Sequence, residues 1–153
     1  MEISDQLQFT FDEENRILYL TQTGPVRITT DRQLIALMEA IRAQMEQHQE
    51  PGRMYMIADM TQLVVVPELS HLYGALAEEI YSIFVYPNGI ARYGHQITHI
   101  TIRRGYMDYR DKNPNLFGTR VEAENYIRSL IARRRAESPE RSIEAMPETS
   151  SVD

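Results

Sequence analysis

The sequence contains no cysteine, and only one of its 16 basic residues, Lys112, is a lysine. The absence of cysteine excludes disulfide bonds, thiolate metal ligands and cysteine nucleophiles, so the chain is compatible with a reducing compartment. We attribute the single lysine to genome composition rather than to function.

Long apolar runs are also missing. No stretch approaches the roughly 18 apolar residues that a membrane span requires, and the start, MEISDQLQF, lacks the basic and apolar regions of a secretory signal. The formal net charge of -6 argues against general binding to nucleic acid or to anionic lipid. We therefore expect a soluble, cytoplasmic protein with no membrane span and no nucleic-acid partner.

The length and composition are typical of one domain. A chain of 153 residues with 42% hydrophobic content can bury a single core of ordinary size. The last stretch, ESPERSIEAMPETSSVD, has too little apolar content to fold. The sequence therefore predicts one domain over residues 1–136 and a disordered acidic, Ser- and Pro-containing tail over residues 137–153.

The first half of the chain predicts a hairpin, a helix and a central strand. Apolar and polar residues alternate over residues 7–12 and 16–23, which is typical of two antiparallel strands. Thr30 and Gln33 form a capping box for a helix that ends near residue 51. Residues 53–60 are short and apolar, as in a buried strand. The apolar stripe of the helix consists of Leu34, Leu37, Met38, Ile41 and Met45.

The second half predicts two more helices and two short strands. Pro67 and Glu68 suit a helix start, and Thr119 with Glu122 forms a second capping box for a final helix. Residues 89–94 and 116–119 are short strand candidates. With these elements, the expected class is α/β, with a mixed sheet of about five strands and about four packed helices.

Residues 95–110 carry conflicting signals. Their isoleucines and threonines favour a strand, and Ile100 and Ile102 alternate as in a strand. Parallel strands at 89–94 and 116–119 would however need a crossover between them, and a helix supplies it. The topology therefore favours a helix over residues 95–110, with the strand as the alternative.

The order of these elements resembles that of STAS-like, SpoIIAA-like bacterial proteins, which share a fold with anti-sigma-factor antagonists. The resemblance covers residues 7–134 and rests on the strand that ends at Asp59 and on NPNLFGTRVEAENYI, where Phe117, Ala123 and Tyr126 occupy the expected positions. It implies a mixed sheet with helices packed on it and a helix over residues 95–110. It supplies a fold more readily than a function. Together with the lack of a catalytic constellation, it favours a regulatory protein that binds a protein partner, with no enzymatic activity and no cofactor.

The same resemblance directs attention to residues 59–70. In the antagonists, an Asp-Ser-Ser-Gly turn follows the strand that ends in Asp, and its second serine is phosphorylated. Counted from Asp59, that turn falls on residues 67–70, so Leu69 stands at the phosphoacceptor position. Ser70 is one residue away and becomes a candidate acceptor only if the alignment slips. Glu68 can imitate a phosphate, although acids also suit a first helical turn.

Residues 59–70 are also unusually apolar for a connection. Val64, Val65 and Val66 precede Pro67, and an exposed apolar patch is typical of a contact site. We expect a constitutive docking surface for a protein partner or a second copy of the chain, formed by Asp59, Val64, Val65, Val66, Glu68, Leu69 and Ser70. Burial of this segment against the chain's own helices is the alternative.

Other candidate chemistry is weaker. His95 and His99 have the i, i+4 spacing of zinc ligands on a helix, but Gln96 replaces the catalytic glutamate of the metalloprotease motif and no third ligand is evident, so no metal site is expected. Arg92, Tyr93, Arg103, Arg104, Tyr106, Tyr109 and Arg110 interleave cations with aromatic rings, as in single-strand nucleic-acid or anion binding. Asp108, Asp111 and the net charge of the chain oppose that use.

Three functional classes therefore remain. A non-enzymatic interaction or regulatory module leads. A carrier of a small apolar ligand or lipid is the alternative, with a pocket between helices and sheet lined by Met38, Met45, Tyr73 and Tyr81. A metal-dependent enzyme that uses His95, His99 or Asp59 comes third.

Overall fold

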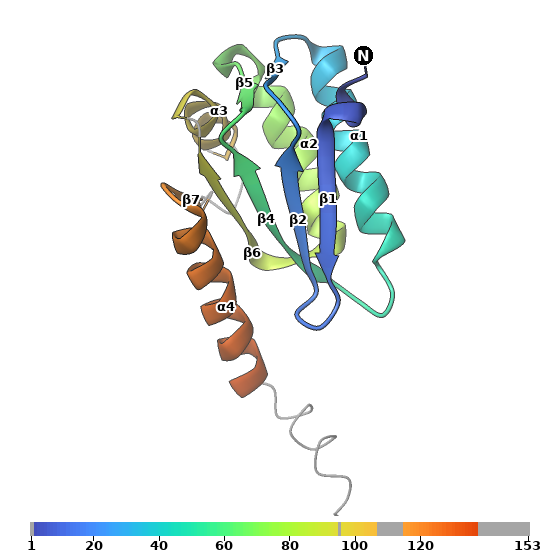
Figure 1. Cartoon of the computed structure of the whole chain (residues 1–153), viewed down its shortest axis with the longest axis vertical. Coiled ribbons are helices and arrows are strands. Elements are labelled where there is room, and N and C mark those ends of the chain that lie inside the picture. The colour runs from blue at the N-terminus through green and yellow to red at the C-terminus, as the bar shows by residue number, and fades with distance from the viewer. Residues whose placement is uncertain (1, 95, 107–114, 138–153) are drawn as a thin grey trace, which may run out of the picture.

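The computed structural model describes residues 2–94, 96–106 and 115–137 (Figure 1). Its main sheet consists of β1 (Leu7–Asp12), β2 (Ile17–Gln22), β4 (Met54–Met60), β6 (Val85–Gly94) and β7 (Leu116–Phe117), in the order β1-β2-β4-β6-β7. β1 is antiparallel to β2, and the other pairs are parallel. The predicted class, α/β with a mixed five-stranded sheet, is confirmed.

The described residues also form four α-helices: α1 (Asp31–Gln47), α2 (Ser70–Phe84), α3 (Gln96–Tyr106) and α4 (Arg120–Ala136). Short 3-10 helices precede β1 (η1, Ile3–Gln6) and α2 (η2, Pro67–Leu69). Both predicted capping boxes are present, Thr30 with Gln33 and Thr119 with Glu122. None of the helices within the described ranges is long and apolar enough to cross a bilayer.

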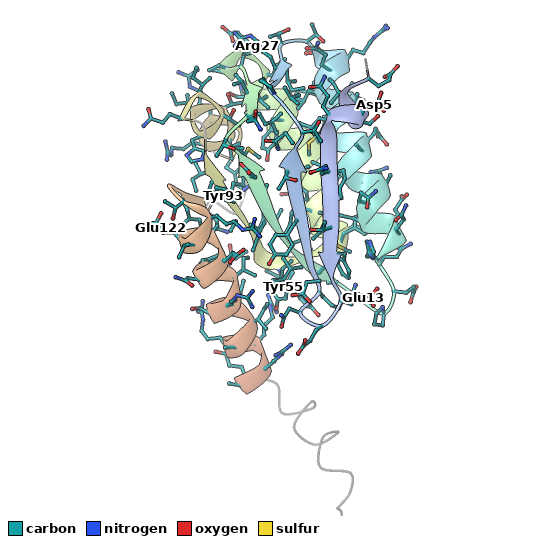
Figure 2. All side chains as sticks on the ribbon, viewed as in Figure 1. Asp5, Glu13, Arg27, Tyr55, Tyr93 and Glu122 are labelled. Atoms are coloured by element: carbon teal, nitrogen blue, oxygen red, sulfur yellow. The ribbon has the colours of Figure 1, made fainter. Side chains whose placement is uncertain are left out.

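The two faces of the sheet carry separate cores because side chains alternate along each strand. Met54, Met56 and Ala58 of β4 join the core under α1, α2 and α3, and Figure 1 shows α1 and α2 behind the strands. Tyr55 and Ile57, the alternate residues, join the core under α4. Tyr93 of β6 belongs to the same second face, and Figure 2 labels it with Tyr55.

A second, two-stranded sheet was not predicted. β3 (Val26–Ile28) pairs in parallel with β5 (Leu63–Val65). Each strand has three residues, too few to display an alternating pattern, and the partner lies far away in the chain. Within the 59–70 segment, which the sequence suggested to be an exposed apolar connection, residues 63–65 are therefore a paired strand. Val65 is only 2% exposed.

The described part of the contested segment, residues 96–106, is helix α3, as the topology favoured, and its threonines explain the misleading strand signal. Thr98 of α3 donates to the Leu63 carbonyl (2.6 Å) and accepts from the Val65 amide (3.1 Å). Its hydroxyl thus satisfies two backbone groups of β5. Thr101 donates to the Val65 carbonyl. The buried face of α3 thus carries threonines, whereas Ile100 is 42% exposed.

The predicted boundary between the domain and the tail stays a prediction. Residue 137 follows α4 as a turn, and its amide donates to the Arg133 carbonyl (2.9 Å). The rest of the predicted tail, residues 138–153, lies outside the described residues.

Candidate ligand-binding site

A break in the register of β6 creates the site. Met54 of β4 pairs with Val85 and Met56 pairs with Ile90, so residues 86–89 lie outside the β4 ladder. The sequence at the break is Tyr-Pro-Asn-Gly. Proline lacks an amide donor, and Asn88 has a positive φ of 60°. Such bulges are common beside functional sites because they redirect side chains.

Hydrogen bonds from later parts of the chain hold this break in place. The Asn115 side-chain amide donates to the carbonyls of Ile90 (2.8 Å) and Asn88 (3.3 Å). The Tyr126 hydroxyl, from α4, also donates to the Asn88 carbonyl (2.8 Å). Residues 86–89 are therefore held in a defined position, as one wall of the site, and are not a frayed strand end.

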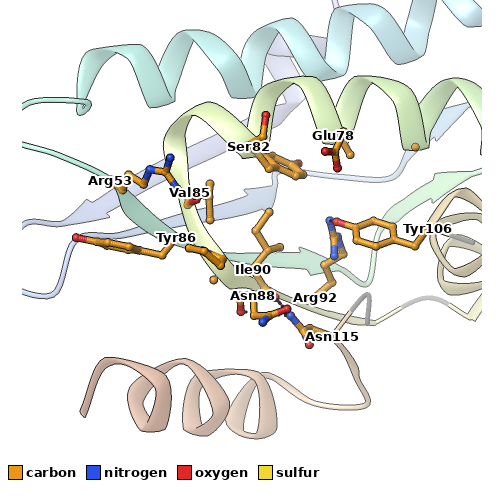
Figure 3. Close-up of a pocket in the computed structure, with 15 residues that line it drawn as sticks. Arg53, Glu78, Ser82, Val85, Tyr86, Asn88, Ile90, Arg92, Tyr106 and Asn115 are labelled. Carbon is orange, nitrogen blue, oxygen red and sulfur yellow. Dashed lines mark hydrogen bonds between the residues drawn. The ribbon is translucent and has the colours of Figure 1, made fainter. Parts of the chain in front are cut away.

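A cavity of about 530 Å³ lies between this wall and the helices α2 and α3 (Figure 3). This volume is within the range of roughly 300–1,000 Å³ that small-molecule sites occupy. Apolar lining comes from Ala77, Val85 and Ile90, and Tyr81 and Tyr86 add aromatic rings. The cavity can therefore accept an organic molecule with an apolar or aromatic body.

Arg92 is the most unusual residue of the lining, because its side chain is buried (1% exposed). Its guanidinium donates to the Tyr106 hydroxyl (2.8 Å), and Figure 3 shows the two side chains meeting end to end. The carbon at the centre of the guanidinium lies 5.1 Å from the Tyr106 ring centroid, 5.8 Å from that of Tyr81 and 5.9 Å from that of Tyr73. Aromatic faces attract cations, so these rings hold the guanidinium in place.

Burial also controls the ionisation of this cluster. It raises the pKa of the Tyr73 hydroxyl to about 12, although the positive charge of Arg92 acts in the opposite direction. Burial lowers the pKa of Arg92, but the tyrosines raise it by more, and the net shift is upward. At neutral pH the cluster therefore combines a charged guanidinium with a neutral Tyr73 hydroxyl.

The charge of the lining is opposite to that of the whole chain. Within the part of the lining that the structure describes, Arg53 and Arg92 contribute two positive charges and Glu78 one negative charge, whereas the chain has a formal net charge of -6. Arg53 is held near the cavity by a contact with the Val85 carbonyl (3.5 Å). A cavity with this balance favours an anionic group over a cationic one.

The predicted docking residues of the 59–70 segment divide into accessible and inaccessible ones. Val65, Leu69 and Ser70 are buried. The Ser70 hydroxyl donates to the Pro67 carbonyl (2.6 Å), so neither a kinase nor a partner can reach it in this conformation. The buried valine corrects the expectation of a wholly exposed apolar connection: β3 and α3 cover it.

Asp59, Val64, Val66 and Glu68 remain accessible. The Asp59 carboxylate accepts from the Thr61 amide (2.8 Å) and the Thr61 hydroxyl (2.6 Å), and so forms the turn at the end of β4. No hydrogen bond of the described residues joins Glu68 to Asp59. These four side chains form part of the surface and line none of the cavities described here.

The expected apolar carrier pocket is only partly present. Met38 and Met45 are packed in the core and line no cavity of carrier size among those described. Tyr81 lines the cavity described above, and Tyr73 lies against Arg92 beneath it. The sequence thus identified the two tyrosines as pocket candidates, and Arg92 only as one member of a mixed basic and aromatic segment. It did not indicate that the tyrosines surround Arg92.

The remaining sequence candidates do not converge on a second site. His95, Tyr109 and Arg110 lie outside the described residues. Within the described ranges, no group of three or more potential metal ligands comes together. Tyr93 packs under α4, on the opposite face of the sheet from the cluster around Arg92.

Comparisons with protein-family models, with curated proteins and with solved structures found no match to this chain. The STAS-like resemblance therefore stays a prediction, and the function has to be argued from the site itself.

Proposed function

We propose that the protein is a non-enzymatic binding module that holds a small organic anion in the cavity between α2, α3 and the break in β6. The observation that carries this proposal is the buried Arg92, a charged side chain on the wall of a cavity of about 530 Å³. A ligand anion that reaches this guanidinium gains a charge-assisted hydrogen bond, which is stronger than a neutral one.

The lining also limits the ligand's chemical class. Rings of Tyr81 and Tyr86 and the aliphatic side chain of Ile90 suit an aromatic or alkyl body, and Arg92 suits a carboxylate, sulfonate or phosphate at one end. This proposal modifies the predicted apolar carrier, because the lining adds the charged Arg92 to the apolar and aromatic groups.

A matched pair of variants tests the location. Ser82 lines the cavity and is exposed, whereas its neighbour Ile83 is exposed and does not line it. The probe is 8-anilinonaphthalene-1-sulfonate, an aromatic anion whose fluorescence rises on binding. We expect one bound probe per chain, a loss of binding of about tenfold or more in Ser82→Trp, and a change below about twofold in Ile83→Trp. Equal effects of the two variants would refute the location.

The interaction module is the second candidate, and one observation favours it. Ile97 and Ile100 of α3 are exposed, and α3 packs on β5 of the 59–70 segment. Val64 of β5 is half-buried. On this proposal, Ile97→Lys combined with Ile100→Lys weakens association with a protein partner and leaves the melting temperature within a few degrees. Unchanged association would count against it.

A further inference from the structure

A second cavity, of about 370 Å³, lies where the β1–β2 turn meets the C-terminal end of α4. The turn contributes Asn15 and Arg16, and α4 contributes Arg134 and Arg135. Figure 1 shows these two parts of the chain at the same end of the molecule. The rings of Tyr55 and Tyr86, with centroids 4.9 Å apart, form a further wall.

The arginines of this cavity are bound to neutral oxygens within the described residues. Arg16 donates to the carbonyls of Arg53 (2.9 Å), His48 (2.5 Å) and Gly52 (2.5 Å). Arg134 donates to the Pro87 carbonyl (3.1 Å), and Arg135 contacts the Asn15 side-chain oxygen (3.5 Å). These bonds fix the side chains in place without neutralising their charge.

One donor at this cavity has no acceptor. The Nε of Arg134 is buried and makes no hydrogen bond within the described part of the chain. The Arg134 guanidinium also lies over the Tyr86 ring, 4.5 Å from its centroid, which fixes its plane. A buried donor without a partner costs about 1–3 kcal/mol, and Arg134, which carries this donor, lines the cavity.

The local charge balance favours an anion. Among the described residues, three arginines and one glutamate, Glu14, line the cavity. The carbonyl end of α4 opposes an anion with a partial charge of only about half a unit, so the arginines prevail. The dipole of α4 accounts for basic residues in its last turn, but not for Arg16, which comes from the opposite end of the sequence.

We infer that this cavity is a second ligand site, for a phosphate-bearing small molecule. Guanidinium groups match phosphate oxygens because each presents two parallel donors. The volume exceeds that of a bare phosphate, so the structure favours a diphosphate or a phosphate ester whose remaining part rests against Tyr55 and Tyr86. This inference does not depend on the function proposed for the first cavity.

Calorimetric titration of the full chain with pyrophosphate, at constant ionic strength, tests the inference. Arg134→Gln and Arg135→Gln should each weaken binding by about tenfold, the effect of losing one charge-assisted hydrogen bond. Arg133→Gln removes the same charge from the same helical turn, and Arg133 lines neither cavity. We expect it to change binding by less than about twofold.

Two variants, Arg135→Gln and Ser82→Trp, allow the inference to be refuted. Arg135 is exposed, so its variant retains the fold even where Arg134→Gln does not. Ser82→Trp, which fills the first cavity, should leave pyrophosphate binding within about twofold. The inference is overturned by an absence of binding at millimolar pyrophosphate, by an equal loss in Arg133→Gln, or by a loss in Ser82→Trp.

Discussion

Replacing Thr98 by valine tests why a segment rich in isoleucine and threonine folds as helix α3. The substitution preserves the shape of the side chain and removes only the hydroxyl. That hydroxyl is fully buried and serves two backbone groups of β5, the Leu63 carbonyl at 2.6 Å and the Val65 amide at 3.1 Å. Each group left buried without a partner costs about 1–3 kcal/mol, so the variant should lose about 2–5 kcal/mol of unfolding free energy.

Urea unfolding measures this loss, and hydrogen exchange localises it to the Val65 amide. Thr98→Ser is the matched control, because it keeps the hydroxyl and removes one methyl group, at a cost of about 1 kcal/mol. A loss below about 0.5 kcal/mol for Thr98→Val, with unchanged protection of the Val65 amide, would show that α3 does not hold the edge of β5.

Three further perturbations test other parts of the account. Gly105→Ala should destabilise the protein by about 1–2 kcal/mol, measured by urea unfolding. A Cβ at this position would lie 2.7 Å from the Ser70 carbonyl oxygen, where α3 crosses α2. An unchanged or higher stability would contradict this close approach. Val65→Asp places a charge at a position 2% exposed and should cost more than about 3 kcal/mol, whereas an unchanged melting temperature would restore Val65 to the docking surface. The contribution of Tyr73 to stability should be constant below pH 10 and fall from there to pH 12, because the pKa of Tyr73 is raised from 10.0 to about 12 in the folded protein, so the unfolded chain loses this proton first. The Tyr73 share is about 2–3 kcal/mol, and Tyr73→Phe should remove it from the pH profile; an identical profile in that variant would refute the shift.

Local signals in the sequence were sufficient for most elements of the fold. The capping boxes at Thr30 and Thr119 depend on side chains three residues apart, so the sequence displays them directly. The alternation over residues 7–12 and 16–23 likewise predicts the β1–β2 hairpin. The pairing of β3 with β5 was missed because it joins two three-residue strands that are distant in the chain.

The candidate site was less predictable, because its main features arise from tertiary packing. Arg92 appeared in the sequence as part of a mixed aromatic and basic segment, and its burial depends on Tyr73 and Tyr81 from α2. The break in β6 did leave a signal, since Pro87 and Gly89 are poor residues for a regular strand. The Val64–Val66 run appeared exposed because no local signal reports that β3 and α3 cover Val65.

The charge dependence of ligand binding tests the central claim, an anion site at the Arg92 cavity, most directly. Among the described residues that line the cavity, Glu78 carries the negative charge. Its neighbour on α2, Glu79, is exposed and does not line the cavity. We would titrate 8-anilinonaphthalene-1-sulfonate into Glu78→Gln and Glu79→Gln at low ionic strength. The dye should bind Glu78→Gln about two- to fivefold more tightly than wild type, and its binding to Glu79→Gln should be unchanged. Unchanged or weaker binding in Glu78→Gln, or the same gain in both variants, would contradict this claim.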